Sequence, residues 1–314
     1  MHSVFLSMRD GHPTRVLVAG DGLTRAEFAP GLGMVCCSLT HRGEELLGQR
    51  GGLRAYAERG STMGIPLLHP WANRLAGSRY VAAGREVELD LGSPLLHSDG
   101  NGLPIHGVLA RHLPFRVTMH SASVDEAHLT AGFDSDRHPQ LSEVFPFRHR
   151  LEVDARLSGS SLSIRTTLTA LDEPVPVSFG YHPYLQLPGV PRERWRIAVP
   201  LTTRLPLDER MIPTGDREPV RIESGELGER GFDDAFADVA DGTRFTLAGD
   251  DRTIAVTFTE GYGFAQLFAP PGQDLICFEP MTAPTNALVD GRGLQVLASG
   301  ESHTGGFSIT VATI

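Results

Sequence analysis

Four short segments of the sequence combine residue types that suit acid–base chemistry on a small polar ligand. The segments are residues 66–74, 99–107, 178–187 and 278–287. In each, prolines, glycines or aromatic residues stand beside a histidine, an arginine or a carboxylate, and stiff loops of this kind often carry function. The three asparagines of the chain, Asn73, Asn101 and Asn286, all lie in these segments. Asn101 stands between glycines, which favours a turn. For the other two, turn and functional roles both stay open.

His182 and Glu279 are the candidates for proton transfer. His182 stands in the sequence Gly-Tyr-His-Pro-Tyr, and an imidazole, with its ordinary pKa of ~6.5, suits a general acid. Glu279 follows the apolar run 275–278 and precedes a proline. A carboxylate at the end of an apolar strand is expected to be partly desolvated, which raises its basicity. Each residue alone also fits a structural role, His182 as a satisfied core histidine and Glu279 as the point where a strand reaches solvent.

Three further residues could hold a polar ligand. The planar guanidinium of Arg74 suits hydroxyl or carboxylate oxygens, although a surface ion pair is the commoner fate of an arginine. His106, before a glycine, could donate to a ligand oxygen or simply occupy a turn. Asp233 begins the acidic segment Asp-Asp-Ala-Phe, which also fits a solvated turn.

The charge balance excludes several classes of protein. The 314 residues include 28 basic ones, all of them arginine, against 38 Asp and Glu, which gives a formal net charge of −10. Without lysine, lysine aldolase and pyridoxal-phosphate mechanisms are excluded because no Schiff base can form. No P-loop lysine can bind a phosphate either. The acidic balance argues against a general nucleic-acid-binding protein, which needs a basic face.

Apolar and polar residues alternate with a period of two in several places, which is typical of strands with one buried face. The alternating stretches are residues 151–157, 162–168, 254–258 and 307–311, and strands are also expected at 16–19 and 33–39. The first two stretches flank a Ser-Gly-Ser turn and predict a hairpin. Short helical turns are expected at 54–59 and 142–145. With no βαβ rhythm and no linker, the pattern predicts one large antiparallel β-domain.

The same sequence indicates the compartment. No apolar run approaches the length of a membrane span, and residues 1–25 lack the continuous apolar region of a signal peptide. Cys36, Cys37 and Cys277 are odd in number and form no Cys-x-x-Cys pair. They suit a reducing cytoplasm without a disulfide framework. We therefore expect a cytoplasmic protein.

Taken together and in this order, the motifs resemble the aldose 1-epimerase (mutarotase) family, in a form similar to a broad bacterial branch. The family shares an Asn-Arg pair, His-Gly, His-x-Tyr, Asp-x-x-Phe, and a glutamate followed by Pro/Thr-rich sequence and an asparagine. The corresponding residues are Asn73-Arg74, His106-Gly107, His182-Pro-Tyr184, Asp233-Asp-Ala-Phe236 and Glu279 to Asn286. The resemblance implies an all-β fold, a single-domain antiparallel β-supersandwich of the galactose mutarotase-like kind over residues 1–314, with few short helices.

The resemblance also implies roles for these residues. Glu279 matches the family's general base and His182 its general acid. The expected substrate-binding residues are Arg74, His106 and Asp233, which match residues that hold the sugar, together with Asn73 and Tyr184 of the same motifs. Asp234 stays an alternative to Asp233, because the choice rests on the spacing to the phenylalanine. No metal and no organic cofactor is implied.

The implied reaction interconverts the α and β anomers of a free aldohexose by ring opening and reclosure. Trp71, Tyr181 or Tyr184 is expected to stack on the apolar face of the sugar. The sequence around His69-Pro-Trp71 and after Gly107 departs from the best-known galactose mutarotases, so the identity of the sugar stays open. The expected partner is a small-molecule sugar, with no nucleic acid and no membrane, and the protein is expected to be a monomer or a homodimer.

Two other functions stay open. A hexose-6-phosphate 1-epimerase of the same fold would need an arginine cluster at one edge of the pocket, for which Arg54, Arg59 and Arg111 are candidates. A non-catalytic sugar-binding protein would need no acid–base pair, so the presence of Glu279 and His182 argues against it. A carbohydrate lyase or hydrolase is disfavoured because no second carboxylate motif suits glycosidase chemistry.

Overall fold

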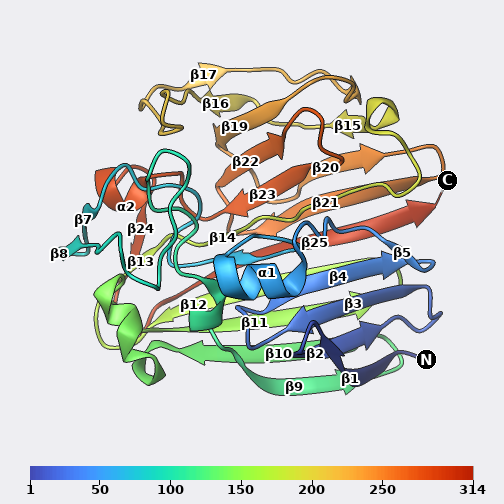
Figure 1. Cartoon of the computed structure of the whole chain (residues 1–314), viewed down its shortest axis with the longest axis horizontal. Helices are drawn as coiled ribbons and strands as arrows, with labels where there is room; N and C mark the ends of the chain where they lie inside the picture. The colour runs from blue at the N-terminus through green and yellow to red at the C-terminus, as the bar shows by residue number, and fades with distance from the viewer. Residues whose placement is uncertain (314) are drawn as a thin grey trace.

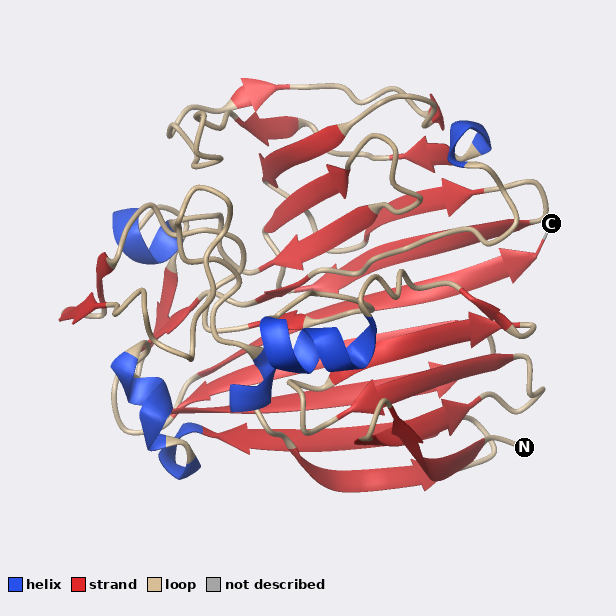
Figure 2. Cartoon of the chain, viewed as in Figure 1, coloured by secondary structure: helices blue, strands red, loops and turns tan. Residues whose placement is uncertain are grey.

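Strands are the predominant regular secondary structure of the computed structural model, which describes residues 1–313, and the helices are short separate pieces (Figure 2). The largest sheet holds nine antiparallel strands within these residues. In spatial order they are β18 (Gly225–Glu226), β15 (Arg196–Ala198), β20 (Thr243–Ala248), β21 (Arg252–Glu260), β25 (Ser302–Thr313), β12 (Ser161–Ala170), β11 (His149–Ser158), β10 (Ala127–Asp134) and β9 (Arg116–Ala122). The predicted hairpin is β11–β12, and its register pairs Leu151 with Leu168 and Leu157 with Leu162.

Two other sheets face the large one. The N-terminal sheet, in order, consists of β1 (Ser3–Arg9), β2 (His12–Val18), β3 (Thr24–Ala29), β4 (Val35–His41) and β5 (Glu44–Glu45). The other consists of β17 (Glu218–Pro219), β16 (Thr203–Leu205), β19 (Phe232–Ala237), β22 (Phe264–Ala269), β23 (Cys277–Met281), β14 (Gly180–Tyr181) and β6 (Leu67–Leu68). We call the latter the site sheet. Single β-bridges, Cys36 to Ile65 and Leu47 to Leu185, join the two sheets into one layer.

The core lies between this layer and the large sheet. One cluster of buried side chains contains Phe28 of the N-terminal sheet, Phe278 of the site sheet, and Val153 and Phe307 of the large sheet. In Figure 1 the strands β1 to β4 lie across β9 to β12, and β2 contacts β10 and β11. Alternation explains the arrangement: every second residue of β11 is buried, from His149 to Leu157, so one face of the strand joins the core. The prediction of an all-β fold is confirmed.

The helices and the two smallest sheets connect these layers. The predicted helical turn at 54–59 is part of α1 (Gly52–Arg59), whereas the turn predicted at 142–145 overlaps only the end of a 3₁₀ helix, Pro139–Glu143. The remaining elements are α2 (Ala287–Asp290), the 3₁₀ helices Ala110–His112, Ser135–Arg137 and Arg192–Arg194, and the strand pairs β7 (Arg79–Ala82) with β8 (Arg85–Glu88) and β13 (Val175–Val177) with β24 (Gln295–Leu297). Among residues 1–313, no helix has the length and apolar character needed to cross a membrane.

Truncation of the core tests this packing. Phe307 is 1% exposed, and its ring lies 5.0 Å from that of Tyr181, centroid to centroid. Phe307→Ala should lower the free energy of unfolding by about 3–5 kcal/mol, because it removes buried apolar area and leaves a cavity. Urea denaturation measures the change. Met119→Ala, on the exposed side of β9, is the control and should cost far less. A loss below about 1 kcal/mol for Phe307→Ala would contradict the two-layer core.

Candidate active site

All seven predicted site residues line one cavity of about 190 Å³ on the site sheet. The lining residues are Arg50, Thr62, Asn73, Arg74, Ile105, His106, His182, Tyr184, Asp233, Gln266, Phe268 and Glu279. They come from four loop segments and three strands: the segment around α1, the loop after β6, the loop before the first 3₁₀ helix, the segment after β14, and the strands β19, β22 and β23. The cavity therefore brings together residues more than two hundred positions apart in the sequence, from Arg50 to Glu279.

Glu279 is presented by strand pairing. It lies in the middle of β23 and is 1% exposed, so the expectation that it ends its strand was wrong: the strand continues through Pro280 to Met281. Glu279 stands opposite Gln266 of β22 in the register. Residues paired in this way point to the same face of a sheet, which is why both side chains reach the cavity.

His182 reaches Glu279 because β14 lies directly between β6 and β23. Gly180 makes this approach feasible, since a Cβ there would lie 2.7 Å from the carbonyl oxygen of Pro280. The backbone N–H of His182 then donates to the carbonyl of Pro66 at 3.2 Å. The result is a contact of 3.3 Å between His182 Nε2 and Glu279 Oε1.

Burial sets the protonation of this pair. Burial, with a contribution from the charge of Asp233, raises the pKa of Glu279 well above its usual range. Burial and the nearby Arg50 guanidinium lower the pKa of His182 to about 3. Both shifts favour neutral groups, as desolvation does in general. The two shifts therefore favour the arrangement in which the pair carries no net charge, with the imidazole neutral and a proton on Glu279.

Arg74 is held by a carboxylate of its own. Its Nε donates to Asp99 Oδ2 at 2.6 Å, and its Nη1 donates to Asn73 Oδ1 at 3.0 Å. Asp99 is fixed in turn by the backbone N–H groups of Asn101 and Leu103. Asn101 thus has the turn role that its sequence favoured. The function of Asp99, which was not among the predicted site residues, follows only from the fold that brings residues 74 and 99 together.

The His-Gly motif fixes the loop that carries His106. Gly107 has a φ of +70°, and a Cβ there would lie 2.1 Å from the carbonyl oxygen of His69, so glycine is required. His106 also has a positive φ, and its Nδ1 accepts from the backbone N–H of Asn73 at 3.2 Å. The two loops therefore hold each other. Asn286 does not line the cavity; its Oδ1 accepts from the backbone N–H of Ala76, which is a structural role.

The two adjacent aspartates point in different directions. Asp233 lines the cavity and accepts a hydrogen bond of 2.6 Å from Gln266 Nε2. Burial raises the pKa of Asp233. Asp234 is turned the other way, toward Arg204, with 3.6 Å between Oδ1 and Nη1. Gln266 was missed in the sequence because no motif surrounds it, and only the pairing of β19, β22 and β23 shows its position.

Of the three aromatic residues expected to stack on the sugar, two are in the core. Trp71 and Tyr181 are each 1% exposed, and the Tyr181 hydroxyl is bonded to Thr166, so this expectation was wrong for both. Tyr184 lines the cavity, with its ring stacked on that of His182 at 4.2 Å between centroids. Its hydroxyl lies 2.6 Å from Thr62 Oγ1.

The arginines proposed for a phosphate do not line the cavity. Arg54 and Arg59 are exposed on α1. Arg111 donates to the backbone carbonyls of Ala57, Glu58 and Pro94. The prediction that these arginines form a cluster at the edge of the pocket was therefore wrong. Arg50, which the sequence did not single out, is the arginine that stands at this edge.

One group of donors in residues 1–313 has the composition of a metal site. His182, Cys277 and Glu279 each offer a ligand atom, and these atoms lie within 4.8 Å of one another. Histidine, thiolate and carboxylate suit a zinc-like ion. A metal held there would occupy the lone pair of His182 and an oxygen of Glu279, so it would compete with proton transfer by the same two groups. Independence from metal stays a prediction.

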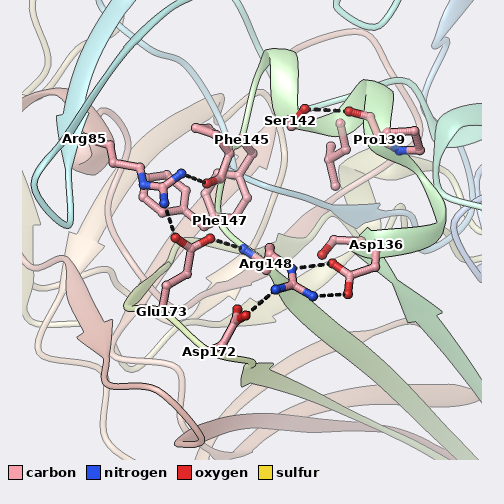
Figure 3. A pocket seen from close by; sticks show the side chains of 12 residues that line it. Arg85, Asp136, Pro139, Ser142, Phe145, Phe147, Arg148, Asp172 and Glu173 are labelled. Atoms are coloured by element: carbon pink, nitrogen blue, oxygen red, sulfur yellow. Dashed lines mark hydrogen bonds and ion pairs between the residues drawn. The ribbon is translucent and has the colours of Figure 1, made fainter.

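A larger hollow of about 620 Å³ lies elsewhere, lined in part by the two 3₁₀ helices around residue 139 (Figure 3). Its charged groups are already paired: Arg148 binds Asp136 and Asp172, and Arg85 binds Glu173. These side chains are largely exposed, so the pairs are weak and solvated. The smaller cavity, with its buried titratable groups, is the stronger candidate for chemistry.

Comparison with known proteins agrees with this geometry. The family model described as aldose 1-epimerase matches residues 33–310. The chain belongs to the aldose 1-epimerase family. It is 25% identical over 262 residues to the uncharacterized protein YihR of Escherichia coli K12, a match covering 78% of this chain and 80% of that protein.

Two solved structures show the same architecture as this family member. The Slr1438 protein of Synechocystis sp. PCC 6803 is 26% identical, with a TM-score of 0.77 and 99% of each chain covered. A galactose mutarotase-like protein of Clostridium acetobutylicum has a TM-score of 0.85 at 18% identity, again over 99% of each chain. The galactose mutarotase-like β-sandwich expected from the sequence is confirmed.

The protonation of His182 can be measured directly. Because its pKa lies near 3 in the folded, sugar-free protein, its imidazole should stay neutral from pH 8 down to about pH 5, whereas an unperturbed histidine titrates near ~6.5. Ring ¹⁵N chemical shifts, assigned by comparison with His182→Gln, report this. The urea-unfolded chain is the control. A midpoint between pH 6 and 7 for folded His182 would contradict the burial argument.

Proposed function

We propose that the protein is an aldose 1-epimerase that interconverts the α and β anomers of a free aldohexose by general acid–base catalysis. The observation that carries the proposal is the buried contact of 3.3 Å between His182 Nε2 and Glu279 Oε1 at the wall of a cavity. Among residues 1–313, the other carboxylate oxygen of Glu279 has no hydrogen-bond partner although it is buried, and the same holds for Gln266 Oε1. Buried polar atoms are nearly always bonded, so these two oxygens mark where sugar hydroxyls would bind.

In the proposed reaction Glu279, as the carboxylate, removes the proton of the C1 hydroxyl. The C1–O5 bond breaks, its electron pair goes to O5, and His182, as the imidazolium, protonates that oxygen. The open-chain aldehyde rotates about the C1–C2 bond. Both proton transfers then run in reverse on the other face of C1, so the protein ends in its starting state. General acid and base catalysis each contribute roughly 10²–10⁴-fold.

The neutral pair and the reactive pair differ only in which of the two residues holds the proton. Neutral Glu279 with neutral His182 holds one proton, and so does the carboxylate with the imidazolium. The two groups are in contact at 3.3 Å, so a proton moves between them without entering or leaving the protein. Interacting groups of this kind titrate as a unit, and the opposite shifts of the two pKa values widen the pH range of the one-proton state.

The remaining residues would orient the sugar. Arg74 cannot lose its charge at any working pH, and its bond to Asp99 fixes the direction of its free donors. Burial keeps the pKa of His106 well below its usual range, so it offers a neutral imidazole to a sugar hydroxyl. Asp233, bonded to Gln266, offers an acceptor.

We also propose that the chain is one domain, because its main core cluster includes side chains of all three large sheets.

Removal of the base tests the proposal. Glu279→Gln should lower the enzyme-dependent rate by about 10²–10⁴-fold, because the amide cannot accept the C1 proton. Polarimetry or NMR on freshly dissolved α-glucose and α-galactose measures the rate above that of the buffer. Asp234→Asn removes a carboxylate of the same region that faces Arg204, and it should keep most of the activity. If wild type matches the buffer rate for every common aldose, the proposal fails.

The pH profile of kcat/KM tests the one-proton pair. Lowering the pH toward the depressed pKa of His182, about 3, adds a second proton and removes the base. Raising the pH above the elevated pKa of Glu279 removes the shared proton and with it the acid. Activity should therefore show no acid limb as the pH falls from about 7 to about 5, after subtraction of the buffer rate. An acid limb with a midpoint near pH 6.5 would contradict the pair, and circular dichroism shows whether the protein stays folded.

A further inference from the structure

We propose that this site selects an aldose whose exocyclic C6 group is a carboxylate, a hexuronic acid, and that Arg50 binds this group. The inference rests on the proposed function, because it uses the positions that acid–base catalysis gives to C1 and O5. It concerns Arg50, a residue outside all four motif segments.

The first argument is a comparison of the two arginines in the cavity. Arg74 is paired with Asp99 at 2.6 Å. Arg50 lines the same cavity but has no carboxylate partner among residues 1–313; its hydrogen bonds go from Nη1 alone to neutral oxygens, the Tyr184 hydroxyl at 3.0 Å and the Thr62 carbonyl and hydroxyl at 3.4 Å. Its Nε and Nη2 groups keep their donors for another partner. Of the two arginines in the cavity wall, Arg50 is therefore the one whose charge has no carboxylate of the described residues in direct contact.

The second argument is that Arg50 is held in place. An exposed arginine is ordinarily mobile, but here the guanidinium carbon lies 5.2 Å from the centre of the Tyr184 ring, over its face. The segment before it is fixed by the hydrogen bond from Gly48 N–H to the Tyr184 carbonyl, at 2.8 Å. Arg50 itself has a φ of +45°, a conformation that costs energy for a residue other than glycine. Such positions cluster at ligand-binding sites.

The third argument is the place of Arg50 relative to the reacting atoms. The Tyr184 hydroxyl lies 3.0 Å from Arg50 Nη1 and 3.3 Å from His182 Nε2, so one hydroxyl separates the arginine from the acid. The acid must stand at O5. The two carbons bonded to O5 are C1, whose hydroxyl faces Glu279, and C5, which carries C6. The group on C6 is therefore the sugar substituent that lies next to Arg50.

The number of charges favours a carboxylate over a phosphate. A single guanidinium matches a carboxylate with two parallel hydrogen bonds. A phosphate ester carries close to two charges at neutral pH and would need further cations. Arg54, Arg59 and Arg111 do not line the cavity, and Arg74 is already paired.

The test compares sugars of one configuration that differ only at C6: D-glucose, D-glucuronate and the uncharged D-glucuronamide. In wild type, enzyme-dependent kcat/KM should be about tenfold or more higher for glucuronate than for glucuronamide. Arg50→Gln, which keeps a donor for Tyr184, should lower the value for glucuronate by about tenfold or more and that for glucose by less than about threefold. Arg54→Gln, four residues away on the exposed side of α1, removes the same charge and should change neither.

Three outcomes would overturn the inference: no preference of wild type for glucuronate over glucuronamide, a higher rate with glucose 6-phosphate than with glucuronate, or an equal loss for glucose and glucuronate in Arg50→Gln. The last would show that Arg50 acts only by positioning Tyr184 and His182. Calorimetric titration with glucuronate separates this from failure of the proposed function. Binding that depends on Arg50 without any rate enhancement would support anion recognition and refute the epimerase. Turnover of neutral aldoses without Arg50-dependent binding of glucuronate would support the epimerase and refute anion recognition.

Discussion

The site depends on the buried contact between a carboxylic acid and an imidazole, Glu279 and His182. Their exposed fractions are 1% and 6%, and an isolated charge in such surroundings would be very unfavourable. With one proton between them the two groups are neutral together, so the fold can hold them beside apolar walls and still deliver a base and an acid. The other charged groups around the pair also need partners. Arg74 is paired with Asp99, and Asp233 is bonded to Gln266.

This contact explains why the site lies at the junction of two sheets. The order β22, β23, β14, β6 puts Glu279 on one strand and His182 just beyond its neighbour, and a side chain at Gly180 would push them apart. The bridge between Leu47 and Leu185 then brings the N-terminal sheet alongside, so that Arg50 and Thr62 reach Tyr184. Without this neighbouring segment the cavity would lack the polar groups of Arg50 and Thr62.

The sequence predicted the strands well because alternation with period two follows directly from burial of one face, as β11 shows. Its motifs also gathered the residues of the cavity, since the loops that need proline, glycine and asparagine are the loops that bend toward one another. It could not predict partners that only the fold brings together, so two residues were missed: Gln266, placed by strand pairing, and Asp99, placed by a contact between loops. The sequence also could not distinguish motif residues that line the cavity from those buried in the core. Trp71 stands two residues before Asn73, yet its side chain is buried.

The unpaired arginine and the catalytic pair are one electrostatic system. Burial first and the charge of Arg50 second hold the pKa of His182 low, and this keeps the shared proton on Glu279 in the sugar-free protein. An anion bound to Arg50 would offset the arginine's charge and ease protonation of His182, since opposite charges nearby favour the ionised form. The equilibrium between the two proton positions would then move toward His182, and the tautomer with the proton on His182 has the base and the acid in the states that ring opening needs. A carboxylate at C6 would thus contribute to catalysis as well as to binding, whereas a neutral hydroxymethyl group at the same place would leave the arginine's effect on His182 in force.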